Sequence, residues 1–245
     1  MQKLEIKVLD HGYVRLRNLA GPTRRLDMDF DADDIDPANA ARFSFDGADK
    51  GRLREDDLKL ANYLMKHKHT TPFEMIVAWF EMKMPIFVAR QFVRHRTVSI
   101  NEISGRYTKL PNDFYIPDTD AIGCKAATNK QGRTLTEVNV YADNFREILS
   151  ATSEGAYAHY TKALEQGIPN ELARCFLPLN IYTKWLWKQD LHNLMHLLML
   201  RLDGHAQYEA RQYAKAIYDL LNEALPNCMK LFREYRTLPD GDYQW

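Results

Sequence analysis

A helix predicted over residues 190–202 carries apolar side chains almost all round its surface. Its sequence, DLHNLMHLLMLRL, interrupts the run of Leu and Met at only a few polar positions. A helix of this kind is buried, either in a protein core or at a subunit interface. The rest of the chain must therefore enclose it. With 245 residues, 45% of them hydrophobic, the chain can bury a sizeable core as one domain or two small ones.

The remaining sequence shows both strand and helix periodicity. Residues 1–20 alternate in period two around Asp10-His11-Gly12, which predicts a β-hairpin. The segments 75–84 and 181–187 are rich in β-branched and aromatic residues and predict further strands. Other segments have apolar residues at helical spacing or helix-start signals, and these predict helices over 55–67, 85–96, 136–167, 168–178, 206–225 and 227–235.

Two connections are predicted between these elements. Thr71–Glu74 is expected to be a turn, because the residue before Pro72 is disfavoured in the helical region. Residues 110–132 are rich in Pro, Asp, Asn and Gly, which favours an irregular crossing loop.

Together these elements predict a helix-rich α+β fold with one small, mainly antiparallel sheet. We find no linker and no internal repeat, so we expect a single domain over residues 1–245. Residues 1–42 contain no motif that we can place. The acidic run at 26–36 lacks the Gly and terminal Glu of a calcium loop, which favours a solvated connection.

Composition limits the function. Lys+Arg and Asp+Glu number 33 each, whereas a general polyanion binder shows a basic excess, so we expect no nucleic-acid partner. No run of about eighteen apolar residues exists, which excludes a membrane-spanning helix. The start, MQKLEIKVLD, lacks the continuous apolar segment of a secretory signal. Three widely spaced cysteines without a CxxC pair are typical of reduced thiols, so we expect a cytoplasmic protein.

Several catalytic motifs are missing. No strand, glycine-rich loop and helix follow one another in the pattern of a Rossmann fingerprint or a P-loop. The G-x-S-x-G nucleophile elbow is also absent. If the protein uses a dinucleotide, it must bind it in another way.

Polar side chains concentrate between residues 90 and 107. Arg90 and Arg94 would share one face of a helix, and Arg94-His95-Arg96 leads into the polar segment 99–105. Arginine forks match phosphate oxygens, and Ser, Asn and Gln suit pyrimidine edges. Gly105 allows a ligand to approach the backbone closely. This inventory predicts a small phosphorylated ligand; the alternative is a plain solvated helix end.

A second polar cluster lies on the predicted apolar helix. His192 and His196 have a spacing that can chelate a metal, but no Glu occupies the metalloprotease position, so we expect no metal site. Arg201 ends the helix, and a buried guanidinium requires an acceptor. An internal carboxylate such as Glu209 would be a purely structural partner.

The segment RHRTVSINEISGRY, Arg94 to Tyr107, resembles the defining motif of the flavin-dependent thymidylate synthases: RHR, seven residues, then Ser104. Further segments resemble the same family in the same order, and they are HTTPFE (69–74), PIFVARQ (85–91), ELARCFLPLNIYT (171–183) and LRLDGHAQYE (200–209). The resemblance extends from about Phe43 to the C-terminus.

This resemblance implies a reaction. The family converts dUMP to dTMP, with methylenetetrahydrofolate as carbon donor and FAD, reduced by NADPH, as hydride donor. It also implies an α+β fold and a homotetramer whose active sites are shared between subunits. No cysteine nucleophile is required.

The resemblance also implies nucleotide contacts. Gln91 and Arg94 would bind dUMP from one subunit, and residues 102–106 would clasp its phosphate and sugar from another. Within that segment the implied contacts are Glu102, Ser104, Gly105 and Arg106. Arg174 would be a further nucleotide contact. Arg201 would bind the uracil edge and stabilise its ionised form, which makes it the predicted catalytic residue.

For FAD, the implied contacts are Thr71, Arg94, His95, Arg96, Glu102, Asp190, His192, His196, Ser44 and His69. The sequence departs from the family pattern on the late helix, where Asn, Arg, and Asn or His are favoured at the positions of Asp190, His192 and His196. A carboxylate at Asp190 would repel a phosphate. His192 can replace an arginine only as a weaker or pH-dependent donor.

Two hypotheses from other classes stay open at this point. A non-catalytic nucleotide- or RNA-binding protein could use residues 94–106 as a phosphate clamp, and its affinity would then fall steeply with salt. A metal-dependent nucleotide hydrolase could use His192 and His196, and it would then retain bound metal.

Overall fold

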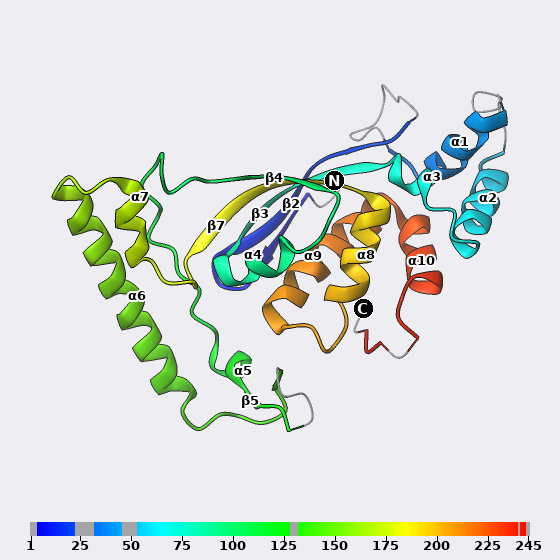
Figure 1. Ribbon diagram of the computed structural model, residues 1–245. Coiled ribbons are helices and arrows are strands. Elements are labelled where there is room, and N and C mark those ends of the chain that lie inside the picture. The colour runs from blue at the N-terminus through cyan, green and yellow to red at the C-terminus, as the bar shows by residue number, and fades with distance from the viewer. Residues whose placement is uncertain (1–3, 23–31, 46–52, 128–131, 240, 244–245) are drawn as a thin grey trace.

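The computed structural model describes residues 4–22, 32–45, 53–127, 132–239 and 241–243 (Figure 1). The first part of the acidic run, including Asp27, Asp29 and Asp31, lies outside the described residues.

A five-stranded sheet forms the centre of the molecule. Its order is β1-β2-β3-β7-β4, and every neighbouring pair is antiparallel. The strands are β1 (Glu5–Val8), β2 (Gly12–Ala20), β3 (Val77–Pro85), β4 (Val98–Glu102) and β7 (Tyr182–Asp190). The predicted hairpin and the predicted strands around 75–84 and 181–187 are confirmed. Strand β4 was not predicted from the sequence.

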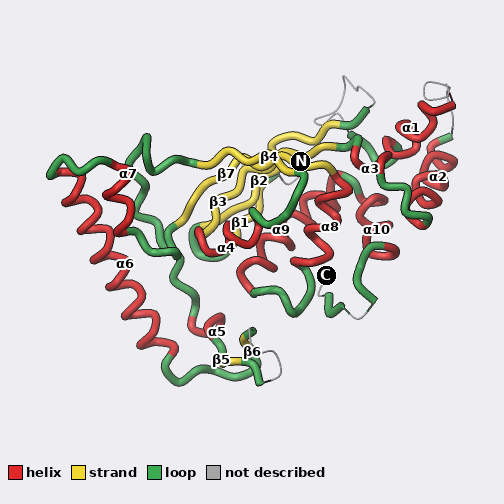
Figure 2. Tube along the Cα trace, viewed as in Figure 1, coloured by secondary structure: helices red, strands yellow, loops and turns green. Residues whose placement is uncertain are grey.

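Helices cover one face of this sheet, as Figure 2 shows for the strands above α4, α8, α9 and α10. These four helices are α4 (Ile86–Phe92), α8 (Leu191–Arg201), α9 (Tyr208–Ala224) and α10 (Pro226–Tyr235). The apolar side of β3 faces them, because Ala78, Phe80, Met82 and Met84 are all buried. The small antiparallel sheet and the helix-rich α+β class are confirmed.

Two further groups of helices stand at opposite sides of the sheet (Figure 1). On one side are α1 (Asp36–Arg42), the 3-10 turn η1 (Phe43–Phe45), α2 (Arg54–Lys66) and α3 (Thr71–Glu74). On the other side are α6 (Ala142–Glu165), α7 (Asn170–Ala173) and the 3-10 turn η2 (Arg174–Phe176). In the chain, between β4 and α6, come α5 (Thr119–Ile122) and a small hairpin of β5 (Cys124–Lys125) and β6 (Arg133–Thr134).

The apolar helix α8 is buried in the core of this chain. Leu194, Leu197 and Leu198 have no exposed surface, and α8 packs against β7, α3 and α9. The remaining strip of its surface carries its polar residues and Leu200, which is 38% exposed. Of the two alternatives for this helix, burial in the core is therefore confirmed.

Several predicted boundaries are wrong. Thr71–Glu74 forms one helical turn, because Phe73 and Glu74 bond back to the carbonyl of Thr70. The helix predicted from residue 136 begins only at Ala142. The helix predicted over 85–96 ends at Phe92, so Arg94-His95-Arg96 lies in the following turn.

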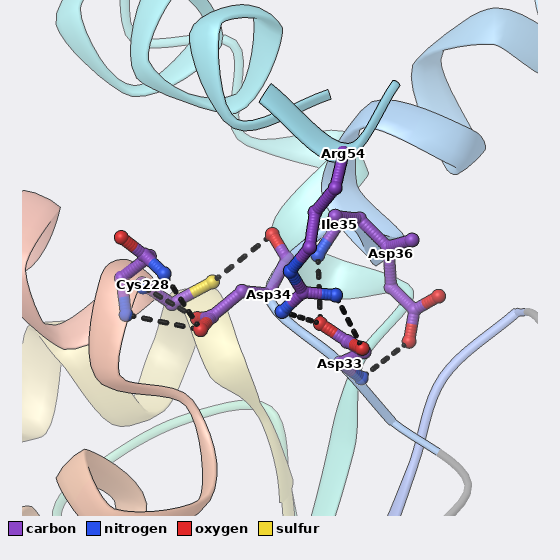
Figure 3. Close-up of polar contacts among 7 residues, drawn as sticks. Asp33, Asp34, Ile35, Asp36, Arg54 and Cys228 are labelled. Atoms are coloured by element: carbon purple, nitrogen blue, oxygen red, sulfur yellow. Dashed lines mark hydrogen bonds and ion pairs between the residues drawn. The ribbon is translucent and has the colours of Figure 1, made fainter. Parts of the chain in front are cut away.

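The described part of the acidic run is not a solvated connection. Asp36 is completely buried at the start of α1, and Asp34 is 3% exposed. The Asp34 carboxylate accepts hydrogen bonds from the backbone N–H groups of Asn227 and Cys228, at 3.1 and 2.8 Å, and from the Asn227 side chain (Figure 3). Asp34 therefore caps the first turn of α10 from a distant part of the sequence.

We predict that Asp34→Ala destabilises the fold by about 3 kcal/mol, because the variant leaves buried N–H donors of α10 without an acceptor. The measurement is the free energy of unfolding in urea at fixed protein concentration. Asp56→Ala is the matched control. Asp56 is exposed, and among the described residues its one ion pair is with Lys59 at 3.5 Å, so its loss should cost less than about 1 kcal/mol. Equal effects in the two variants would contradict the capping role.

Candidate functional site

The turn after α4 directs one histidine inward and two arginines outward. The backbone N–H of His95 donates to the carbonyl of Phe92 at 3.0 Å, which tightens the turn. Thr97 has a φ of +58°, an unusual conformation for a β-branched residue. As a result His95 is buried, whereas Arg94 and Arg96 are exposed on either side of it.

Arg201, the last residue of α8, contacts this turn. Its Nε donates to Nε2 of His95 at 3.0 Å, and its Nη2 donates to the carbonyl of Gln91 at 3.4 Å. The expected structural partner Glu209 is not its acceptor. Glu209 is buried and instead accepts a hydrogen bond from Arg133 at 2.7 Å. Among the ion pairs of the described residues, none gives Arg201 a carboxylate.

Burial keeps His95 neutral. Desolvation, followed by the charges of Arg201 and His196, lowers the pKa of His95 from 6.5 to about 4. Burial and the neighbouring Arg94 also lower the pKa of Arg201 from its ordinary value, but a guanidinium remains cationic at neutral pH. The neutral His95 ring therefore accepts from Arg201 at Nε2 and carries its own proton on Nδ1.

A cleft of about 370 Å³ opens between this turn and α8. We call it the RHR cleft; its lining includes Arg94, His95, Arg96, Thr97, Gln189, Asn193, His196, Leu200 and Arg201. No carboxylate belongs to this lining, and the His95 and His196 rings lie 6.4 Å apart. The cleft thus concentrates positive charge where a bound anion would meet it.

Gln189 is a lining residue that the sequence analysis missed. Its side-chain N–H donates to the carbonyl of Arg96 at 3.0 Å, while its Oε1 is buried without a partner. Position 189 follows Trp185 and Trp187 on the inward face of β7. A polar residue on an otherwise apolar inward stripe was the signal that could have identified it.

The RHR cleft fits part of an extended anionic cofactor. Its volume is at the lower end for ligand sites, so it suits a diphosphate group rather than a whole dinucleotide. Arg94 and Arg96 supply exposed guanidinium forks, which can pair with the oxygens of a diphosphate. On these grounds the residues present are compatible with FAD.

Two predicted FAD contacts around the start of α8, Asp190 and His192, lie outside the RHR cleft. Asp190 caps the helix, because its carboxylate accepts from the backbone N–H and side-chain amide of Asn193 at 2.9 and 2.8 Å. The His192 ring contacts Arg236 through Nδ1 at 3.0 Å, and burial followed by this arginine lowers its pKa. Neither residue lines the RHR cleft. Within the described ranges, no group of three or more His, Cys, Asp or Glu side chains could hold a metal ion.

A second cluster of predicted residues lies beyond the other end of β4. Ser104 Oγ accepts from the backbone N–H of Arg106 at 3.2 Å, and Arg106 pairs with Glu171 at 3.3 Å. Gly105 lies so close to Arg174 that an added Cβ would be 3.3 Å from its Cδ. We call Glu102, Ser104, Gly105, Arg106 and Arg174 the Ser104 cluster. In it Glu102 accepts a hydrogen bond from Thr183.

The two clusters do not meet within one chain. Thr97 lines the RHR cleft directly before β4, and Ser104 follows β4. At about 3.3 Å per residue, an extended segment of this length separates them by roughly 20 Å. The structure therefore assembles the predicted site as two separate halves, one at each end of strand β4.

Three predicted residues lie in the α1–α3 region. Ser44 is in η1, between the strongly exposed Phe43 and Phe45. His69 follows α2, with its ring 6.1 Å from that of Tyr63, and Thr71 begins α3. None of the three lines the RHR cleft.

Gln91 does not line the RHR cleft but lies beside Arg201 in a second cleft. Its side-chain amide donates to Gln207, and both residues line this second, larger cleft of about 910 Å³ together with Arg201. Arg201 therefore borders two clefts.

Comparisons with known proteins agree on one family. The family model described as "Thymidylate synthase complementing protein" matches residues 28–227. A flavin-dependent thymidylate synthase of Rickettsia bellii is 43% identical over 94% of this chain and 79% of its own length. A flavin-dependent thymidylate synthase of Thermus thermophilus is 45% identical over 95% of this chain and 79% of its own length.

A solved structure has a similar fold. The UMP/dUMP methylase PolB from Streptomyces cacaoi, bound with 5-Br dUMP, superposes with a TM-score of 0.82 at 26% identity. The superposition covers 96% of this chain and all of PolB. The chain belongs to the family of thymidylate synthase complementing proteins, together with these flavin-dependent thymidylate synthases.

Proposed function

We propose that the protein is a flavin-dependent thymidylate synthase, a methyltransferase that converts dUMP to dTMP. Methylenetetrahydrofolate is the carbon donor, and FAD reduced by NADPH supplies the hydride. The curated relatives carry this name, and the superposed methylase acts on UMP or dUMP. The observation that carries the proposal is Arg201, a charged guanidinium without a carboxylate partner, held by a neutral histidine beside two clefts.

Arg201 can supply the catalytic stabilisation that this reaction needs. C5 of uracil becomes nucleophilic only as negative charge spreads over the ring. A preoriented guanidinium stabilises that charge where it develops. His95 fixes Nε of Arg201 without neutralising its charge, because the ring itself is neutral. Nη2 is oriented by the carbonyl of Gln91, and Nη1, for which the described residues provide no acceptor, would face the pyrimidine.

The cofactor contacts extend from the RHR cleft. Arg94 and Arg96 would pair with the diphosphate of FAD, with His95 and His196 bordering the same space. Thr71, Glu102, Ser44 and His69 complete the proposed set. We also retain Asp190 and His192: Asp190 would act through the helix terminus that it caps, and His192 through Nε2.

We further propose that dUMP is bound between subunits of a homotetramer. Gln91, Arg94 and Arg201 would come from one subunit and the Ser104 cluster from another, which would reunite the separated halves. Exposed apolar side chains on α6, α7 and η2 support such an assembly, among them Ile148, Leu172 and Phe176.

We propose a cytoplasmic, single-domain enzyme over residues 1–245. The cysteines of the chain form no disulfide in the structure. No helix among the described residues is long and apolar enough to cross a membrane.

The first test is the absorption spectrum of the purified protein, followed by titration with dUMP. Flavin bands that shift as dUMP binds are expected, because nucleotide and flavin would share one site. A protein that stays colourless after incubation with FAD would remove the redox mechanism.

Arg201→Ala should retain flavin but lose dUMP binding, with turnover reduced at least about 100-fold, since it removes the charge that stabilises the ionised uracil. Flavin absorbance, dUMP titration and dTMP formation are measured on the same preparation. Arg17→Ala, at an exposed arginine of β2, is the matched control and should behave like the wild type. Turnover near the wild-type rate in Arg201→Ala would refute the assigned role.

The pH dependence of stability tests the neutral state of His95. Between about pH 4 and 6.5 the unfolded chain binds a proton at this histidine and the folded chain does not, so stability falls as the pH is lowered through that window. Urea unfolding of the wild type and His95→Gln is compared at pH 7 and pH 5. The wild type should lose more stability than the variant. Equal losses would show that His95 is protonated in the folded state.

Mixing inactive variants tests the shared sites. Arg201→Ala and Arg106→Ala should each be inactive alone. After joint refolding or co-expression, random tetramers should recover about a quarter of the wild-type rate, because some sites combine two intact halves. If each subunit holds a complete site, mixing restores nothing.

A further inference from the structure

The larger cleft beside Arg201 contains more positive charge than the proposed chemistry explains. This cleft, of about 910 Å³, lies between the β5–β6 hairpin and the start of α9. Gln91 and Arg201 line it, and three further cations, Lys125, Arg133 and Arg211, line it as well. We call this space the basic cleft.

Few of these charges are balanced. Arg133 pairs with the buried Glu209, whereas Arg211 donates only to the carbonyl of Gly204 at 2.9 Å. For Lys125, Arg201 and Arg211, the ion pairs found among the described residues include no carboxylate. The lining itself contains no Asp or Glu, although the whole chain is neutral. An occupant of this cleft must bring several negative charges.

One arginine of the cleft, Arg133, is held in a fixed position. Arg133 donates to Glu209 at 2.7 Å, and its guanidinium lies over the ring of Tyr208 at 5.2 Å. Glu209 also accepts from Tyr115 at 3.0 Å and from Gln207 at 2.9 Å. The Nε of Arg133 is buried without an acceptor. Such a network is typical of a preorganised binding residue rather than of a mobile surface cation.

An apolar groove continues from the basic cleft. Its volume is about 570 Å³, and it shares Arg133 and Gln207 with the basic cleft. Its apolar side is formed by Phe87, Phe145, Leu149, Pro178 and Leu179. The combined surface therefore suits a ligand that joins a ring system to a chain of anionic groups.

We propose that the basic cleft binds the multiply anionic end of a co-substrate. The anions are the glutamate carboxylates of the folate donor or the phosphates of the reduced dinucleotide. The inference deepens the proposed function and rests on it. Within dUMP, Arg201 is assigned to the uracil and the phosphate to the Ser104 cluster, so Lys125 and Arg211 are left without an anionic partner. Arg201 borders both the basic cleft and the RHR cleft. A co-substrate bound in the basic cleft would therefore lie next to the residue that is proposed to bind the pyrimidine.

The test uses Lys125→Gln, Arg211→Gln and the double variant in the full-length protein with FAD. Lys125 is exposed, so its variant is expected to fold even if Arg211→Gln does not. Lys59→Gln, an exposed lysine on α2, is the matched control. The KM values are measured for dUMP, NADPH, and mono- and triglutamyl methylenetetrahydrofolate.

The double variant should raise the KM of one co-substrate at least tenfold and change the KM of dUMP less than twofold. If the folate tail is the ligand, the variant loses the advantage of the triglutamyl over the monoglutamyl form. If the dinucleotide is the ligand, it loses the preference for NADPH over NADH. Unchanged KM values for both co-substrates, or an increase for dUMP alone, would overturn the proposal.

Direct binding measurements test the basic cleft independently of enzyme activity. The probes are p-aminobenzoyl-triglutamate and adenosine 2′,5′-bisphosphate, measured by calorimetry on the wild type and the double variant. One probe should bind the wild type and bind the double variant at least tenfold more weakly. Failure of both to bind would refute the cleft assignment even in an active enzyme. An enzyme without dTMP formation would refute the function while these titrations still report on the cleft.

Discussion

The pairing of β3 with β7 determines where the candidate site forms. The two strands pair in register from Val77 opposite Asp190 to Pro85 opposite Tyr182. Each strand leads directly into a helix, β3 into α4 and β7 into α8. Because the strands are antiparallel, these helices start at opposite ends of the pair and run back along the same face. The turn after α4 and the end of α8 thereby meet, and His95 contacts Arg201.

The sequence predicted most of these elements but not their contacts. Their β-branched and aromatic residues identified β3 and β7, and the apolar surface of α8 required its burial. Strand β4 was missed because it has five residues, mostly exposed, and pairs only with β7. The structural alternative for Arg201, an ion pair with a carboxylate such as Glu209, is wrong, since an apolar helix shows that a buried cation needs a partner without identifying it. His95, 106 positions away in the sequence, is brought to Arg201 only by the sheet pairing.

The candidate site is positively charged, although the chain as a whole has no net charge. A neutral protein has gathered arginines in two adjoining clefts whose linings hold no carboxylate. Holding such charges together without counterions destabilises the ligand-free protein, and Arg201 is also partly desolvated. Anionic ligands would relieve this repulsion, so their binding should be coupled to folding stability. The neutral His95 limits the cost, because a charged ring at that position would add a further cation.

The contact of Asp34 with α10 gives the segment around Asp34 a role in stabilising the fold. Asp34 joins residues near the start of the chain to a helix near its end, and α10 in turn packs on α9 and α2. A shortened protein that begins at Phe43 would keep every motif of the family resemblance yet lose this clasp. Asp34 and the helix that follows it therefore belong to the minimal folding unit, and a truncation designed from motifs alone would leave the first turn of the last helix without its cap.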